Sequence, residues 1–396
     1  MKGIKKVRLS EISELITKGT TPTTLGYKFQ DEGINFLKIE CFDENGHFIE
    51  NKVAHISDEC NEKLKRSQLQ VGDILFSIAG AIGRVGVVTE EMLPANTNQA
   101  LAIIRINRED IYLPYIRLIL TSPIVKEQFE KKKQGVAQLN ISLKDINELT
   151  IPLPNKDYQE RSVALFDKVA GVIQSRKDEL QKLDDLIKAR FVEMFGDPEE
   201  NPNRWDKKQL SEVIVNANNG MARRGNDENG EIVMRLVELQ DGYIDYSNPN
   251  RIILEDNEKK RYLLKDQDFL FARVNGNPDN VGRCAVFHEI GEPVYHNDHI
   301  IRVHFDERLI DGTFVSALLN SDYGKKQLKS KIKTSAGQYT VSQDGIGAIV
   351  AILPPIENQN IFADFVQQIN KTKSVIQKSL DETQLLFDSL MQQYFG

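Results

Sequence analysis

Basic and amide side chains recur at corresponding places in the two halves of this sequence. In each half a run of lysines leads into a glycine and then a glutamine. Lysine and arginine neutralise phosphates, while arginine, lysine, asparagine and glutamine can reach base edges, so the pattern favours contact with duplex DNA. A solvated helix end, where lysine suits the dipole, is the alternative. The candidates are Lys126, Lys131, Lys132, Lys133, Gln138 and Asn140, and in the second half Lys325, Lys331, Lys333, Gln338 and Tyr339.

A predicted hairpin loop in each half, together with a stretch near it, carries a second group of candidates. These loops differ between the halves, as two readers of different sequences require. Ordinary turn chemistry is the alternative for any one of these residues, because Asn-Gly and Gly-Asn pairs are common in turns. The candidates are Lys18, Thr20, Thr21, Gly80 and Arg84 in the first half, and Arg223, Arg224, Arg273, Asn275 and Arg283 in the second.

A search for catalytic residues finds no constellation present in both halves. The glycine-rich stretch 80–86 lacks the lysine of a phosphate loop and is better interpreted as a hairpin. Four histidines follow Cys284, but a metal site needs three or four converging ligands and the first half has no matching histidine. We therefore predict no catalytic, cofactor-binding or metal-binding residues, and a chain that is not an enzyme.

The elements that must position these residues form a tandem duplication. Adding 200 to positions in the first half reproduces apolar positions in the second, from Ile146/Ile346 through Leu180/Leu380 to Phe195/Phe395. Further upstream the offset slips by a few residues, as loop insertions would cause. Each copy is a globular part followed by a long helix.

Each predicted long helix has an apolar seam. From 157 to 195 there is no proline, and the apolar positions, once Arg176 and Arg190 are included, alternate in steps of three and four, as in a coiled coil. At 1.5 Å per residue such a helix spans roughly 58 Å. We expect the two helices to pair antiparallel through Phe166, Val169, Ile173, Leu180, Leu183, Ile187, Ile369, Ile376, Leu380, Phe387 and Leu390.

The predicted fold class is α+β, with two duplicated mixed α/β domains separated by an antiparallel pair of coiled-coil helices. The segments are a first domain at 1–155, a central helix at 156–196, a second domain at 197–355 with a linker at 197–205, and a C-terminal helix at 356–396. Single helices are expected at 113–133 and 313–331, a strand at 234–239 and a capped short helix after Ser142. We interpret Trp205 as a structural anchor.

Composition sets the remaining bounds. The chain has 396 residues and a net charge of −7, which counts against a protein that grips DNA strongly by itself. The two globular segments are nearly balanced, since 1–155 has 20 basic and 20 acidic residues (net 0) and 206–355 has 19 and 22 (net −3). No apolar run suggests a membrane span, and three scattered cysteines indicate a reducing cytoplasm.

The duplicated order of motifs resembles the DNA-specificity (S) subunit of type I restriction-modification systems. The motifs are 73–76 before the glycine hairpin, 138–142, Ile151-Pro152-Leu153-Pro154 with Gln159, and 191–198, together with their second-copy counterparts. This resemblance implies two target-recognition domains that read the halves of a bipartite, asymmetric DNA site. It also implies that the helices act as a ruler and dock two modification subunits. Those partners would hold S-adenosylmethionine, and a motor-nuclease subunit would join for cleavage.

A structural tether with two protein-binding globes, spaced by a coiled coil, is the alternative function. It differs from the DNA-reading hypothesis in predicting that loss of the basic helix ends leaves DNA retention unchanged at every salt concentration. The sequence does not indicate which bases are read, because base readout depends on loop geometry.

Overall fold

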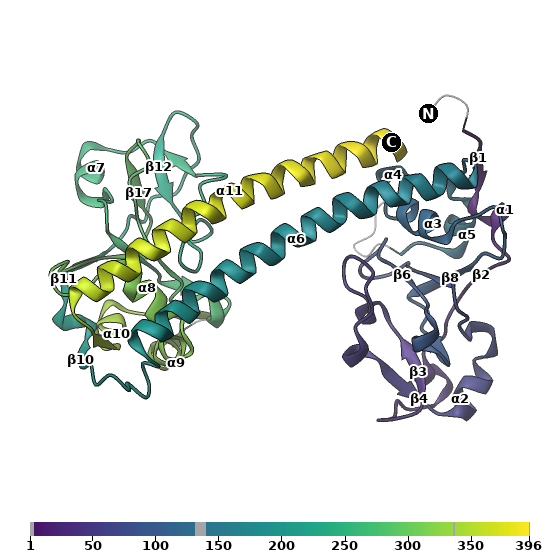
Figure 1. Ribbon diagram of the computed structural model, residues 1–396, viewed down its shortest axis with the longest axis horizontal. Coiled ribbons are helices and arrows are strands. Elements are labelled where there is room, and N and C mark those ends of the chain that lie inside the picture. Colours follow the sequence, from purple (N-terminus) through teal and green to yellow (C-terminus); the bar gives the residue numbers. More distant parts are fainter. Residues whose placement is uncertain (1–3, 131–139, 336, 396) are drawn as a thin grey trace. The chain divides into compact units, whose positions relative to one another are not determined.

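The computed structural model describes residues 4–130, 140–335 and 337–395. It divides into two compact units, unit 1 being Met1–Arg176 with Ser379–Gly396 and unit 2 being Lys177–Lys378. Both units contain a mixed α/β domain and part of each long helix (Figure 1). Among the described residues, no helix combines the length and the apolar composition needed to cross a membrane.

Among the described residues, three sheets build the domain of unit 1. The strands are short and largely buried, as suits sheets covered on both faces. The sheets are β1 (Lys6–Arg8) with β9 (Thr150–Pro152); β2 (Leu15–Lys18), β8 (Leu101–Arg105), β5 (Ile74–Ser77) and β6 (Val85–Val87) in that order; and β4 (Ala54–Ile56), β3 (Ile34–Leu37) and β7 (Ala95–Thr97), with β3 and β7 parallel.

Unit 2 repeats these sheets strand for strand. The repeats are β10 (Asp206–Gln209) with β21 (Val350–Leu353); β11 (Ile214–Asn219), β18 (Ile300–Phe305), β14 (Phe269–Ala272) and β16 (Cys284–Val286); and β13 (Arg251–Ile252), β12 (Glu231–Met234) and β17 (Val294–His296). A further sheet in unit 2 comprises β15 (Val274–Asn275), β20 (Gln338–Thr340) and β19 (Lys333–Ser335). The common strand order confirms the duplicated α+β fold at the level of topology.

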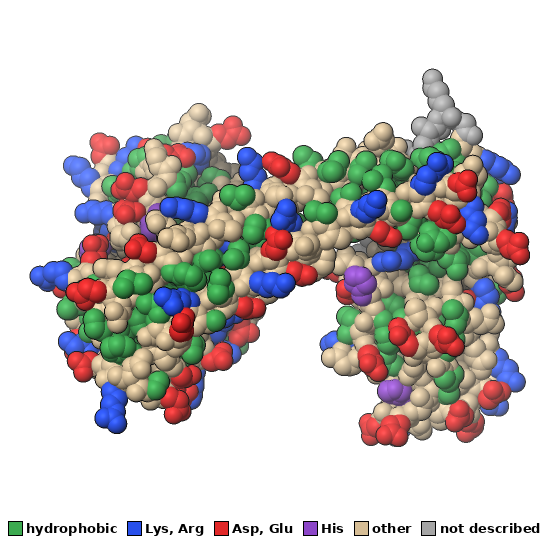
Figure 2. Space-filling view, in the orientation of Figure 1, with side chains coloured by type: hydrophobic (Ala, Val, Ile, Leu, Met, Phe, Trp, Pro, Cys, Tyr) green, Lys and Arg blue, Asp and Glu red, His purple; other side chains and the backbone are tan. Residues whose placement is uncertain are grey.

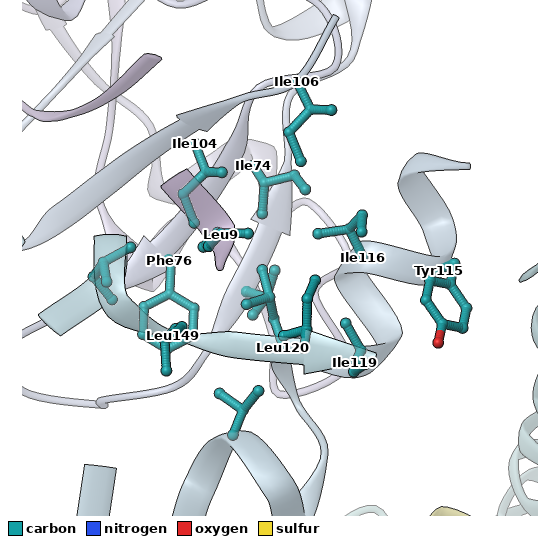
Figure 3. Close-up of a cluster of buried hydrophobic side chains, with 14 of the residues drawn as sticks. Leu9, Ile74, Phe76, Ile104, Ile106, Tyr115, Ile116, Ile119, Leu120 and Leu149 are labelled. Atoms are coloured by element: carbon teal, nitrogen blue, oxygen red, sulfur yellow. The ribbon is translucent and has the colours of Figure 1, made fainter. Parts of the chain in front are cut away.

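The main core of unit 1 lies between the four-stranded sheet and the helices that cover it. Figure 3 shows Ile74, Phe76 and Ile104 of the sheet in one cluster with Ile116 and Leu120 of α3 (Leu113–Leu120). These side chains are almost completely buried. Branched and aromatic residues dominate this core, and their burial is the main favourable contribution to folding.

The short helices follow the same pattern in both units. Unit 1 has α1 (Leu9–Ile12), α2 (Asp58–Lys63), α3 (Leu113–Leu120), α4 (Pro123–Glu130) and α5 (Leu143–Glu148), and unit 2 has α7 (Asp256–Tyr262), α8 (Gly312–Asn320), α9 (Asp322–Lys331) and α10 (Gln343–Gly347). The predicted cap at Ser142 is confirmed, since its Oγ accepts a hydrogen bond from Asp145 N at 3.2 Å.

Two of the expected helices and one expected strand are wrong in detail. The helix predicted at 113–133 breaks between α3 and α4, where Pro123 disfavours helical geometry in the residue before it. The helix predicted at 313–331 breaks at Ser321, whose side chain caps α9 by accepting from Gly324 N at 3.2 Å. The strand predicted at 234–239 instead ends at Met234, because the next residues form a turn closed by the Glu238 carboxylate.

The two long helices, α6 (Lys156–Phe195) and α11 (Ile356–Phe395), each contribute to both units. In unit 1, Phe166 of α6 packs against Phe387 and Phe395 near the end of α11, with ring centroids 5.4 and 5.6 Å apart. Tyr115 of α3 contacts Phe395 at 5.8 Å. The last turns of α11 therefore contribute aromatic side chains to the core of unit 1.

Unit 2 shows the reciprocal packing. Phe191 and Phe195, at the end of α6, pack against Phe362 near the start of α11, with both centroid distances at 5.6 Å. Lys373 of α11 forms a 2.5 Å ion pair with Asp184 of α6. Within each unit, the end of one long helix packs beside the start of the other: the start of α6 contacts the end of α11, and the end of α6 contacts the start of α11. The two helices therefore pair antiparallel, as predicted.

The predicted seam residues all lie in the protected part of the helices. Phe166, Ile173 and Leu380 are buried. Half-buried are Val169, Leu180, Leu183, Ile187, Ile369, Ile376, Phe387 and Leu390. Trp205 beyond α6 is confirmed as an anchor, because its Nε1 donates to Phe195 O at 2.9 Å.

Candidate nucleic-acid interface

Two loops cross at the same place in both domains. The loop after β2 meets the loop after β7 in unit 1, where Thr20 N donates to Thr97 O at 3.2 Å; in unit 2 the corresponding bond runs from Met221 N to His296 O at 3.0 Å. Glycine is required at each crossing. A Cβ on Gly19 would lie 1.9 Å from Thr97 O, and one on Gly220 would lie 2.2 Å from His296 O. The duplicated fold thus presents one pair of loops twice.

In unit 1 the candidates near this crossing are partly held by other loops. The backbone N and the hydroxyl of Thr21 both donate to Gln99 Oε1. Arg84, in the loop between β5 and β6, donates to Phe42 O at 3.3 Å. Gly80 in the same loop is exposed with a φ of +71°. Lys18 and Thr20 are half-buried.

In unit 2 the two predicted arginines of the first loop are ion-paired. Arg223 contacts Glu255 at 2.7 Å and Glu258 at 3.0 Å, and the hydrogen bond that its guanidinium donates to Glu255 raises the pKa of Arg223. Arg224 contacts Asp298 at 2.7 Å. These contacts pin the loop to its neighbours and offset both charges locally.

The loop between β14 and β16, residues 273–283, contains the other two candidate arginines of unit 2. Arg273 donates from Nη1 to Asp298 O at 3.1 Å, and Arg283 donates to Gln240 Oε1 at 3.3 Å. Asn275 accepts from Asn277 N at 2.8 Å, which is turn chemistry of the kind the sequence left open. All three side chains are half-buried.

The described residues include only part of the basic segments predicted to contact phosphates. Lys126 on α4, Lys325 on α9 and Lys333 on β19 are exposed, while Lys331 and Tyr339 are half-buried. Also exposed are Asn140 and Gln338. The predictions for Lys131, Lys132, Lys133 and Gln138 lie outside the described residues. Figure 2 shows basic and acidic side chains interspersed on the face in view, in agreement with the balanced charge of the domains.

A hollow of about 350 Å³ brings some of the second-half candidates together. Its lining residues are Asn219, Arg273, Lys333, Thr340, Val341, Ser342, Gln343 and Asp344. Sequence reasoning missed Asn219 and Gln343. Their positions correspond to Lys18 and Leu143 in the first copy, and a search for polar side chains that replace other residue types between the copies would have found Gln343.

Among the described residues, no three His, Cys, Asp or Glu side chains converge to hold a metal ion. His296 is instead a fully buried part of β17, with Nδ1 3.1 Å from Tyr262 O. Burial lowers the pKa of this imidazole to about 4.

Acidification should therefore destabilise unit 2. Between pH 6.5 and 4 the unfolded chain binds a proton at His296 that the folded chain does not, so stability falls as pH is lowered through this window, by about 3 kcal/mol at most. A His296→Thr variant, with the residue found at the matching position 97, should show a flatter profile. Hydrogen exchange of β18 amides at several pH values measures the free energy of unfolding of unit 2 in both proteins. Parallel profiles for the two proteins would contradict it.

The described geometry is duplicated, with the same strand order and loop crossing in both domains but unlike loops beside the crossing. Comparisons with known proteins show what the chain is similar to. The model of the type I restriction modification DNA specificity domain matches residues 1–184. The StySPI specificity subunit of Salmonella potsdam is 25% identical over 364 residues, covering 88% of this chain and 78% of its own. The EcoKI specificity subunit of Escherichia coli (strain K12) is 21% identical over 407 residues, covering 96% and 86%.

Solved structures agree in fold. A chain from a type I R-M system, described for its complex assembly and conformational transition, has a TM-score of 0.60 at 16% identity and covers 100% of this chain and 98% of its own. The S subunit from M. genitalium has a TM-score of 0.54 at 14% identity, with 100% and 97% covered. In sequence, the chain is therefore similar to type I restriction-modification DNA specificity subunits.

Proposed function

We propose that this chain is the DNA-reading subunit of a type I restriction-modification complex and performs no catalysis itself. Each domain reads one half of a bipartite, asymmetric site on double-stranded DNA. The chain supplies sequence recognition, and its partners supply the reaction. We place S-adenosylmethionine on two modification subunits, with a motor-nuclease subunit joining for cleavage.

One observation carries this proposal. The two domains share their strand order and their loop crossing, yet the loops beside the crossing differ in length and in side chains. Residues 78–84 separate β5 from β6, whereas residues 273–283 separate the corresponding β14 and β16, a difference of 11 − 7 = 4 residues. A common scaffold with unlike loops suits two readers of unlike sequences.

The long helices offer a surface for the modification subunits. Both expose apolar side chains that a helix in water alone would not favour, and Figure 2 shows hydrophobic side chains along them. The exposed residues are Val172, Leu186, Val192, Ile361, Val375, Leu385 and Leu386. Leu186 and Leu386 occupy matching positions in the duplication and are 46% and 52% exposed, which supports equivalent docking of two identical partners.

A domain exchange tests the proposal. The chain is co-expressed with its cognate modification subunit, and modified adenines are mapped across a genome. Replacing residues 206–355 with the corresponding segment of another family member should change the second half of the modified sequence completely and leave the first half intact. Replacing residues 1–155 is the reciprocal control.

The same experiment distinguishes DNA reading from the alternative function, a structural tether. Identical modification patterns from the parent and the exchanged chain would refute DNA reading by the second domain. A tether with two protein-binding globes would then be favoured, and DNA retention should be insensitive to Lys325→Ala and Lys333→Ala at every salt concentration.

A further inference from the structure

The hollow in unit 2 lies where the end of β11, the start of the loop after β14, the β19–β20 hairpin and the start of α10 meet. We propose that it is the base-reading site of the second domain, and that Arg273 and Gln343 determine which bases are accepted. This inference rests on the proposed function and assigns its specificity to particular side chains.

The backbone around the hollow is the same in both domains. Arg273 N donates to His299 O at 2.7 Å, and Val341 N donates to Arg273 O at 2.9 Å. In unit 1, Ile78 N donates to Ala100 O at 2.9 Å and Ile141 N donates to Ile78 O at 3.0 Å. Arg273 therefore occupies the backbone position of Ile78.

The side chains at these matched positions differ in kind. Ile78 is 4% exposed and belongs to the core of unit 1, so the scaffold itself does not require a charge at this position. Partial burial of a guanidinium is unfavourable unless its donors are used. Gln343 likewise corresponds to Leu143, a half-buried apolar residue packed against the core of unit 1. The second domain has thus replaced two apolar side chains with two that can hydrogen-bond a base.

The donors and acceptors in the hollow are already oriented. The bond from Arg273 Nη1 to Asp298 O uses one of the five N–H donors of the guanidinium and fixes its direction. Gln343 Nε2 donates to Asn219 Oδ1 at 3.2 Å, which leaves the Gln343 carbonyl and the Asn219 amide nitrogen for a ligand. Arginine pairs with the O6 and N7 of guanine, and an amide pairs with the N6 and N7 of adenine.

The charge of the hollow favours a base edge over a phosphate. Arg273 and Lys333 are cationic, but Asp344 places a carboxylate in the same lining. A phosphate would be repelled by that carboxylate, whereas base edges present donors as well as acceptors. We assign Arg273 to a guanine and Gln343 to an adenine within the second half-site.

The test substitutes the residues that the first domain carries. Arg273→Ile and Gln343→Leu variants are each co-expressed with the modification subunit, and modified adenines are mapped. Each variant should lose about 5- to 150-fold discrimination at one base pair of the second half-site, a different one for each, with the first half-site unchanged. Arg308→Ala, an exposed arginine outside the hollow, is the matched control and should modify the parental sequence.

Two results would overturn the assignment. Unchanged discrimination by both variants would show that the hollow is structural. A uniform loss of affinity for all sequences, with a shallower salt dependence, would identify a phosphate contact. If Arg273→Ile failed to fold, Gln343→Leu alone would decide, because its side chain contributes no core packing. Failure of the proposed function is distinguishable, since the parental complex would then modify no bipartite sequence.

Discussion

A Gln359→Leu variant will lose about 3–5 kcal/mol of stability in unit 2. Gln359 lies in the first turn of α11 and is fully buried. It accepts a hydrogen bond from Asp311 N at 2.9 Å and donates to Leu309 O at 3.2 Å and Pro354 O at 2.7 Å. Leucine has a similar volume but would leave one N–H and two carbonyls buried without a partner, at about 1–3 kcal/mol each.

Hydrogen exchange of α8 amides measures this loss, because a chain with two units need not unfold in one step. Gln367→Leu, on an exposed part of the same helix, is the matched control and should change little. Unit 1 offers an independent repeat, since Gln159 bonds Tyr112 N at 2.8 Å, Asp110 O at 3.1 Å and Pro154 O at 2.8 Å. Wild-type protection in Gln359→Leu would contradict the prediction.

An Asp73→Asn variant should destabilise unit 1 by about 3–5 kcal/mol, because it leaves a largely buried guanidinium without its counter-charge. Arg105 donates to Asp73 from Nε and from Nη2, both at 2.7 Å. The side chains of Arg105 and Asp73 are 17% and 0% exposed, and the hydrogen bonds that Arg105 donates to Asp73 raise the pKa of Arg105. Exchange of β5 and β8 amides reports the change.

A double variant separates the ion pair from simple packing. Asp73→Leu with Arg105→Leu removes both charges and should recover most of the stability, because apolar replacement of a buried pair is often nearly neutral. Asp110→Asn removes the partner of Arg108 in an exposed pair and should have no measurable effect. If the double variant were less stable than Asp73→Asn, the ion pair would not be the cause.

The sequence predicts the large-scale architecture well. The seam from Phe166 to Ile187 predicts α6, because apolar residues at steps of three and four need a covering helix. The matching seam in the second copy predicts the partner, and the aromatic pair Phe191–Phe362 confirms the direction of pairing. The breaks at Ser122-Pro123 and Ser321 were missed, since the apolar periodicity continues across them. The interruptions are local, being Pro123 in the first copy and the Ser321 cap in the second.

The candidate site was less predictable. Arg273 was singled out by residue type, and matching backbone hydrogen bonds confirm that it is equivalent to Ile78, which has the same offset of 195 as Asp73 and Asp268. The meeting of Arg273 with Gln343 around one hollow was not predictable, because the two residues lie 70 positions apart (343 − 273) on different elements. Arg223 was also predicted by type, and its pairing with Glu255 and Glu258 depends on tertiary contacts about 30 positions away. The individual DNA contacts therefore stay predictions.

The packing of Phe395 has a consequence for biosynthesis. Its ring is fully buried against Tyr115 and Phe166, although 229 residues separate Phe395 from Phe166 (395 − 166). Domains generally fold from the N-terminus as the ribosome releases them. Here the first domain is synthesised early, but an aromatic residue of its core is added only after residues 177–378, which form unit 2, have been made. A nascent chain must therefore keep this apolar gap shielded from water and from other chains while unit 2 is being synthesised.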